Sequence, residues 1–233
     1  ITSNVNGGYL SLGHVRRASS GASNVVSPHP FLFTWNNRTI SFAHNGTLNK
    51  DVLIDLITES GTDFSWIYNN PLETYGCGDW DASNVIDSCV VDSELYFLWI
   101  MKNVVQMNNL KTGFLNALSI LEEIDMDLLY GSQKNCILSN GEIIYAYRSY
   151  DNDDVWSGAH HDIYFSESDY HYYVMSYPPP TSWLDWTSLN NYSILILEND
   201  NHTIIENING GYNWGCTNDY ACNYKLDATM DDG

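Results

Sequence analysis

Hydrophobic and polar positions alternate in short runs through the first part of the chain. Residues 31–35 and 38–43 are two such runs, separated by Asn36 and Asn37. Asparagine tolerates the positive φ that a two-residue hairpin turn requires. The pattern therefore predicts a β-hairpin, and the looser alternation over residues 9–18 predicts a strand before it.

The middle of the chain changes to a helical period. Apolar residues three and four positions apart within residues 51–60 predict a helix that ends at Gly61. A longer helix is predicted to open at Asp92, with Val105 on its apolar face. A further helix is predicted from Gly113 to about Ile124.

The last third returns to strand patterns. Ser139, Asn140 and Gly141 separate apolar runs at residues 134–138 and 142–149, which is typical of a β-hairpin. Further strands are predicted at residues 163–166, 172–176, 192–197 and 203–206. Strands, then helices, then strands again indicate an α+β fold.

Composition sets bounds on organisation and partners. The 233 residues are 44% hydrophobic, which allows one main domain, predicted over residues 1–209, and a short module over residues 210–233. A formal charge of −20 excludes nucleic acid and anionic membranes as natural partners. We expect no membrane span, because no apolar run approaches the roughly 20 residues that one needs.

Two strand ends carry candidate chemistry. The first predicted strand delivers His14, Arg16 and Arg17 into a turn of small residues, which suits an anion. The run that ends at Ala43 is followed by His44, then by an amide side chain and a glycine, Asn45 and Gly46, which suit an oxyanion. The histidines show no zinc-ligand spacing, so we expect them to be structural.

Seven motifs in this order resemble one family. The sequence is similar to the class II glutamine amidotransferases of the N-terminal-nucleophile hydrolase superfamily, especially their small stand-alone members. The matching pieces are Gly13-His14-Val15-Arg16, Ala18-Ser19-x-Gly21, His29-Pro30-Phe31, Ala43-His44-Asn45-Gly46, Asp92-Ser93-Glu94, Leu138-Ser139-Asn140-Gly141, and Ser176-Tyr177-Pro178 followed by Trp186.

The resemblance implies a four-layer αββα sandwich and a site for glutamine or a γ-glutamyl amide, with no cofactor needed for catalysis. It implies that Arg16 grips the substrate carboxylate with support from Ser19. Asn45 and Gly46 would form the oxyanion hole, and Asp92 would receive the α-ammonium group. Asp92 before an apolar helical run is also typical of an ordinary helix N-cap, and both roles can hold together.

The family's nucleophile is a cysteine at the mature N-terminus, several strands before the residue equivalent to His14. None of the five cysteines occupies that place, and thirteen residues precede His14. Either the first part of the domain lies before this sequence, or it has been removed, or the protein never had it. We expect a companion segment to supply the missing first strands of the sandwich.

The tail resembles the Cys- and Asp-rich modules that recur in secreted and cell-surface bacterial proteins. This resemblance implies a Cys216–Cys222 disulfide and an extracellular or cell-surface location. It also makes calcium a candidate ligand of the tail's acidic side chains, Asp219, Asp227, Asp231 and Asp232. Cys77 and Cys89, at a loop expected over residues 68–88, could form a second disulfide, and their pairing with each other or with Cys136 stays open.

Two functions of different classes remain. The first is a glutamine or γ-glutamyl amide hydrolase that uses an upstream cysteine. The second is an amidotransferase-like domain without catalysis that serves as a subunit of an extracellular assembly, filament or homo-oligomer. An exposed N-terminal cysteine would distinguish the first from the second.

Overall fold

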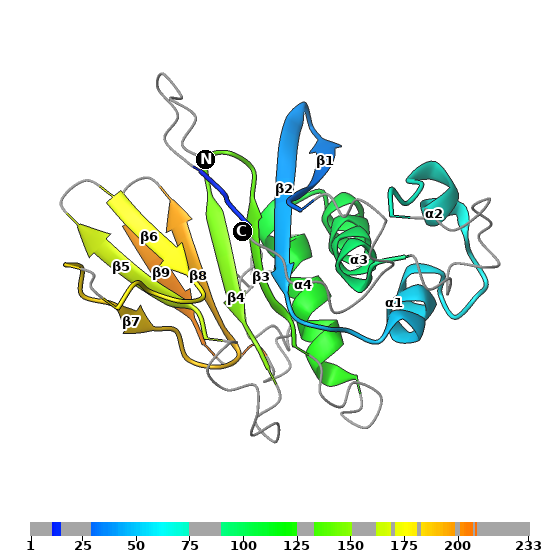
Figure 1. The fold of residues 1–233 in the computed structure, drawn as a ribbon. Coiled ribbons are helices and arrows are strands. Elements are labelled where there is room, and N and C mark those ends of the chain that lie inside the picture. Colours follow the sequence, from blue (N-terminus) through cyan, green and yellow to red (C-terminus); the bar gives the residue numbers. More distant parts are fainter. Residues whose placement is uncertain are drawn as a thin grey trace, which may run out of the picture.

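The computed structural model describes the chain in several stretches (Figure 1). These are residues 11–14, 29–74, 90–124, 133–150, 162–168, 171–180, 183–198, 201–206 and 208. Its helices are α1 (Lys50–Ile57), α2 (Ser65–Asn69), α3 (Asp92–Met107) and α4 (Leu110–Glu123). Its strands are β1 (Phe31–Trp35), β2 (Arg38–Asn45), β3 (Asn135–Ser139), β4 (Ile144–Arg148), β5 (Tyr164–Ser168), β6 (His171–Met175), β7 (Thr187–Ser188), β8 (Ser193–Glu198) and β9 (Asn201–Ile205).

The strands form two antiparallel sheets. The larger has the order β1-β2-β3-β4-β8-β9, and the smaller has the order β6-β5-β7. Figure 1 shows the long helices α3 and α4 beside the larger sheet and the smaller sheet beyond β4, β8 and β9. The mixed α and β composition expected from the sequence is confirmed.

Alternation along the strands explains the layers. Phe42 and Tyr145 are fully or almost fully buried in the core shared with the helices. Ala146, the neighbour of Tyr145, belongs instead to a second apolar cluster, with Phe165 and Val174 of the smaller sheet packed against it. Successive strand residues point to opposite faces, so the central strands have an apolar residue on each side. The described residues thus form three layers of the expected four, in the order helix, sheet, sheet.

Helix α3 is buried along most of its length. Every residue from Asp92 to Val104 is buried, because α1, α4 and the larger sheet all pack around this helix. Val105 is 39% exposed, so its predicted place on the core face was wrong. A Cβ added to Gly113 would lie 2.4 Å from the Cα of Val104, so α4 crosses α3 at close range and needs a glycine there.

Helix α4 begins three residues earlier than predicted. Asn109 is its N-cap, and the Asn109 side chain accepts a hydrogen bond of 2.9 Å from the backbone N–H of Thr112. Helix α1 ends earlier than predicted, at Ile57, because Glu59, Ser60 and Gly61 all have positive φ.

The first hairpin is confirmed and the second is looser than predicted. Asn36 and Asn37 have φ of 49° and 59°, as a tight turn requires. In the second hairpin β4 begins at Ile144 rather than Glu142. The carbonyl oxygen of the Asn140 side chain accepts hydrogen bonds from the backbone N–H groups of Glu142 and Ile143, which holds a longer loop.

Strands β5, β6, β8 and β9 confirm the predicted positions within one or two residues at every end. The short elements α2 and β7 were not predicted, because five-residue and two-residue elements carry too little periodicity. Of the strand predicted over residues 9–18, residues 11–14 are described and are not in a strand. None of the helices in the described stretches is long and apolar enough to cross a bilayer.

Candidate functional site

A cavity of about 310 Å³ lies at the end of strand β2. Asn45 ends this strand, pairs with Asn135 of β3, and is exposed. The cavity brings Gly13 and His14 of the first motif beside His44 and Asn45 of the second, which are thirty positions away in the sequence. Its remaining lining residues are Ala43, Asn135, Cys136, Ile137, Ile163, Val174, Met175 and Ser176.

The buried His44 side chain holds the end of β2 through two hydrogen bonds. Its ring is 3% exposed, with Nδ1 2.9 Å from the hydroxyl of Ser93 and Nε2 2.8 Å from the carbonyl oxygen of Gln133. A carbonyl oxygen only accepts hydrogen bonds, so Nε2 carries the proton and, in the neutral ring, Nδ1 accepts from Ser93. His44 therefore has the structural role expected of it.

Gly46 is required by packing. A Cβ at this position would lie 2.0 Å from the carbonyl oxygen of Gln133, and Gln133 also donates its N–H to the carbonyl of Thr47 at 3.1 Å. The backbone of residues 46–47 thus lies directly against the start of the β3 segment, where no side chain fits. The glycine suits a backbone N–H donor, and it is also needed for this contact.

Asp92 holds the loop that follows Gly46. Its Oδ2 accepts a 2.8 Å hydrogen bond from the backbone N–H of Leu48, and the residue is 3% exposed. The N-cap of α3 is Val91, and Asp92 is the first helical residue, so the N-cap interpretation was wrong. The carboxylate of Asp92 instead ties α3 to the segment that carries Asn45 and Gly46.

Glu94 makes a parallel connection to another segment. Its carboxylate accepts from the backbone N–H groups of Glu73 and Thr74 and from the Thr74 hydroxyl. Burial raises the pKa of Glu94, and the hydrogen bonds from Thr74 and Glu73 oppose this rise. The hydroxyl oxygen of Thr74 in turn accepts from the N–H of Val91 at 3.0 Å.

Asp92, Ser93 and Glu94 therefore contact three different parts of the chain. They reach Leu48, His44 and the Glu73–Thr74 segment respectively. Sequence reasoning assigned a role to Asp92 alone and missed the other two. Contacts across 20 to 49 positions leave no local periodic signal, and only the motif itself marked these residues.

The first motif is placed only in part. The rings of His14 and His29 are stacked with centroids 4.5 Å apart, and His29 also contacts Phe31 at 4.5 Å. Residues 13–14 therefore lie beside the start of β1. Arg16, Arg17 and Ser19 lie outside the described residues. Asp92 of α3 lies against the segment that carries Asn45 and Gly46. Of these three residues, Asn45 is the one that lines the cavity.

The cysteine and metal predictions are little tested. Cys136 is a free, buried thiol, and burial raises its pKa to about 12, so it is a poor nucleophile at neutral pH. Within the described stretches no group of three or more His, Cys, Asp or Glu side chains could hold a metal ion. The cysteines of the predicted disulfides and the acidic residues of the tail lie outside those stretches. They are Cys77, Cys89, Cys216, Cys222, Asp219, Asp227, Asp231 and Asp232.

Comparison with known proteins adds a family to this geometry. Residues 8–64 match the family model of the class-II glutamine amidotransferases. An uncharacterized protein of Methanocaldococcus jannaschii is 31% identical over 141 residues, which cover 60% of this chain and 31% of that protein. The chain thus spans less than a third of the length of this curated relative.

Solved structures are more distant. A glutamine aminotransferase class-II domain protein from Silicibacter pomeroyi is 17% identical, with a TM-score of 0.46 over 72% of this chain and 67% of that one. The glutamine phosphoribosylpyrophosphate amidotransferase of B. subtilis is 15% identical, with a TM-score of 0.46 over 83% and 34%. Both TM-scores are below 0.5, so the assignment rests on the sequence match. Residues 8–64 are thus similar in sequence to the class-II glutamine amidotransferases.

Proposed function

We propose that this domain hydrolyses the side-chain amide of glutamine or of a γ-glutamyl compound. The observation that carries the proposal is the position of Asn45 and Gly46 at the end of β2, where Asn45 lines a cavity together with Gly13 and His14. A cavity of about 310 Å³ is large enough for one amino acid.

The proposed chemistry is acyl transfer. A thiolate attacks the amide carbon, and the negative charge that develops on the amide oxygen is stabilised by the Asn45 side-chain N–H and the Gly46 backbone N–H. The carbon–nitrogen bond breaks, the nitrogen takes a proton and leaves as ammonia, and water then hydrolyses the thioester to a free carboxylate. Arg16 and Ser19 would bind the α-carboxylate of the substrate, and Asp92 its α-ammonium group.

The nucleophile in this proposal is an upstream cysteine at the mature N-terminus, and a companion segment supplies the first strands of the sandwich. Cys136 does not suit the role, because the residue is only 2% exposed and its thiol lies 3.7 Å from the Tyr96 hydroxyl. We further propose that the domain works outside the cell. There the Cys216–Cys222 pair would be oxidised, and calcium would bind the acidic residues of the tail.

The test begins with the mature protein purified from its natural source. Intact mass and N-terminal sequencing would show whether a chain that begins with cysteine is present. The same preparation is then assayed for ammonia release from glutamine, with asparagine as the matched control substrate. The proposal predicts a terminal cysteine and release from glutamine only. A mature protein without a terminal Cys, Ser or Thr nucleophile would exclude this mechanism.

A second candidate is a structural domain that has kept the fold without the reaction. Two contacts favour it: the packing of Gly46 against Gln133 and the hydrogen bond between Asp92 and Leu48. Both stabilise the fold, so a domain without catalysis would keep them. This alternative predicts a stable homo-oligomer or filament and no ammonia release. A native protein that stays monomeric at all concentrations would count against it.

A further inference from the structure

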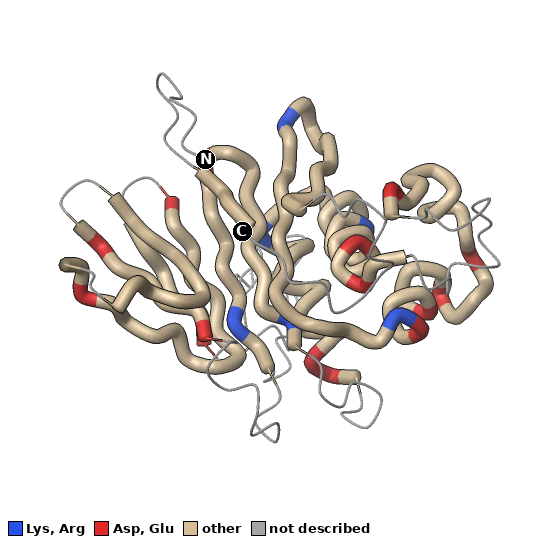
Figure 2. Tube along the Cα trace, viewed as in Figure 1, with Lys and Arg blue, Asp and Glu red and all other residues tan. Residues whose placement is uncertain are grey.

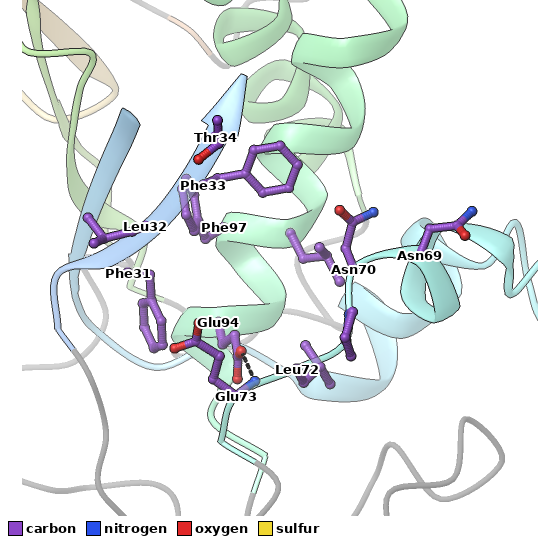
Figure 3. A pocket seen from close by; sticks show the side chains of 12 residues that line it. Phe31, Leu32, Phe33, Thr34, Asn69, Asn70, Leu72, Glu73, Glu94 and Phe97 are labelled. Atoms are coloured by element: carbon purple, nitrogen blue, oxygen red, sulfur yellow. Dashed lines mark hydrogen bonds between the residues drawn. The ribbon is translucent and has the colours of Figure 1, made fainter. Parts of the chain in front are cut away.

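A second cavity, of about 300 Å³, lies at the edge of strand β1 that faces away from β2, and it is separate from the one lined by Asn45. Figure 3 shows β1 on one side, the segment that carries Asn70 and Leu72 on the other, and α3 behind. The proposed reaction uses none of its twelve lining residues. They are Phe31, Leu32, Phe33, Thr34, Asn69, Asn70, Pro71, Leu72, Glu73, Glu94, Phe97 and Leu98.

The inner wall of this groove is aromatic and rigid. Phe31 and Phe97 are only 3% and 4% exposed, and Phe33 packs edge to face on Phe97 with centroids 6.3 Å apart. Phe33 is also stacked on Trp66, at 6.1 Å. Of Phe31, Phe33 and Phe97, Phe33 is the ring that is partly exposed, so it offers a ligand apolar contact area at little cost in side-chain entropy.

The outer wall is a strand edge. β1 pairs with β2, and no other described strand pairs with β1. Trp35 and Arg38 flank the two-residue turn, so they form a hydrogen-bonded pair, and bonded and non-bonded pairs alternate from there. The backbone N–H and C=O groups of Leu32 and Thr34 therefore point away from β2, along the groove.

The groove is acidic. None of its lining residues is Lys or Arg, and Glu73 is exposed, whereas the carboxylate of Glu94 is buried and accepts hydrogen bonds from Glu73 and Thr74. In the described part of the chain the Lys and Arg ion pairs use Glu142, Glu59, Glu122 and Asp162, and none uses Glu73. The negative charge of Glu73 is therefore available to a partner.

We propose that this groove, defined by β1, Asn69–Glu73 and the start of α3, binds an extended basic peptide of another protein. The peptide adds a strand to β1 through the backbone groups of Leu32 and Thr34. An apolar side chain of the peptide packs on the partly exposed ring of Phe33, and a Lys or Arg side chain reaches Glu73.

Charge decides between this occupant and a second copy of the chain. The sequence has 29 acidic and 9 basic residues, and Figure 2 shows acidic positions on both the helical side and the smaller sheet. Two copies would bring like charges together at an acidic groove, which disfavours pairing. A basic segment of a different protein meets complementary charge at the same place.

The experiment measures the fluorescence anisotropy of a labelled peptide, acetyl-Leu-Arg-Leu-Arg-Leu-amide, titrated with the protein. We expect saturable binding that weakens as salt is raised. Thr34→Pro removes the outward N–H but none of the β1–β2 hydrogen bonds, so it should weaken binding at least about tenfold. Thr34→Ala keeps the N–H and is the matched control, with affinity within about twofold.

Two further measurements keep the proposal falsifiable if Thr34→Pro unfolds. A peptide N-methylated at alternate residues lacks the backbone N–H groups that would donate hydrogen bonds to β1. It should also bind at least about tenfold more weakly. Glu73→Gln should weaken binding and reduce its salt dependence. Equal binding of the N-methylated peptide, equal binding of a Leu-Glu-Leu-Glu-Leu peptide, or no binding by the unaltered protein would overturn the proposal.

Discussion

The Cα of Gly46 lies so close to the backbone of Gln133 that a Cβ would be 2.0 Å from the Gln133 carbonyl oxygen. The same oxygen accepts the hydrogen bond from Nε2 of His44, at 2.8 Å. The segment that presents Asn45 is thus held by a steric contact on one side and a hydrogen bond on the other. Stability and site geometry depend on the same atoms here.

Gly46→Ala should destabilise the fold because the added methyl group meets backbone atoms that cannot rotate away. Overpacking of this kind costs about 1–3 kcal/mol in the free energy of unfolding. Urea unfolding measures the change. Gly13→Ala is the matched control, since a Cβ there has nothing within 4 Å, and it should change stability by less than about 0.5 kcal/mol. Equal effects of the two substitutions would contradict the packing described.

His44 and Ser93 should be energetically coupled. A double-mutant cycle with His44→Phe and Ser93→Ala isolates their hydrogen bond, which is buried and 2.9 Å long. We expect a coupling of about 1 kcal/mol in the free energy of unfolding. Additive losses, with no coupling, would mean that the His44 ring does not accept from this hydroxyl.

Glu94 should make stability depend on pH. Burial raises its pKa above the ordinary value of 4.5, so the folded protein binds this proton more tightly than the unfolded chain does. The stability that comes from the protonated Glu94 carboxyl is therefore complete below about pH 4.5 and is lost as the pH rises through the raised pKa of Glu94. The unaltered protein should lose stability relative to Glu94→Gln over this window. Parallel urea-unfolding profiles for the two proteins from about pH 4 to pH 8 would refute this assignment.

The buried ion pair of Glu122 and Lys134 should contribute far more to the free energy of unfolding than an exposed ion pair does. Their side chains are 1% and 4% exposed with N and O atoms 3.1 Å apart, and Tyr147 and Ser149 also donate to Glu122. Lys134→Met leaves a buried carboxylate without its cation, at a cost of about 3–5 kcal/mol.

The control for this substitution is Arg38→Met. Arg38 pairs with Glu142 at the surface, where the two side chains are 48% and 67% exposed. Removing an exposed pair should change the free energy of unfolding by about 0–1 kcal/mol. Thermal unfolding compares the two variants. A loss at Arg38 as large as that at Lys134 would contradict the burial described.

Local signals in the sequence predicted most of the strands and helices that the structure describes. The Asn36-Asn37 turn is an example, because both residues carry their conformational preference themselves. The start of α4 at Leu110 was missed because the polar residues Lys111 and Thr112 interrupt the apolar pattern, so Asn109 was not recognised as the N-cap. Val105 was misplaced because α3 is buried on nearly all sides up to Val104, so its apolar residues do not define a single face.

The candidate site was predictable only as a motif. The sequence identified Asn45, Gly46 and Asp92 by resemblance, and the structure places them on adjoining segments. It did not reveal that Ser93 supports His44 or that Gln133 excludes a side chain at position 46. These contacts join residues 49 and 87 positions apart, and no local pattern specifies such a pairing.

The most direct test of the central claim is the kcat for glutamine hydrolysis by the mature protein and its Asn45→Ala variant. We expect a loss of about 10²- to 10³-fold in kcat, because one oxyanion donor is removed. Asn69→Ala, an exposed asparagine at the other cavity, should leave kcat unchanged. An unchanged kcat in Asn45→Ala would contradict the claim that the end of β2 stabilises the reaction's oxyanion.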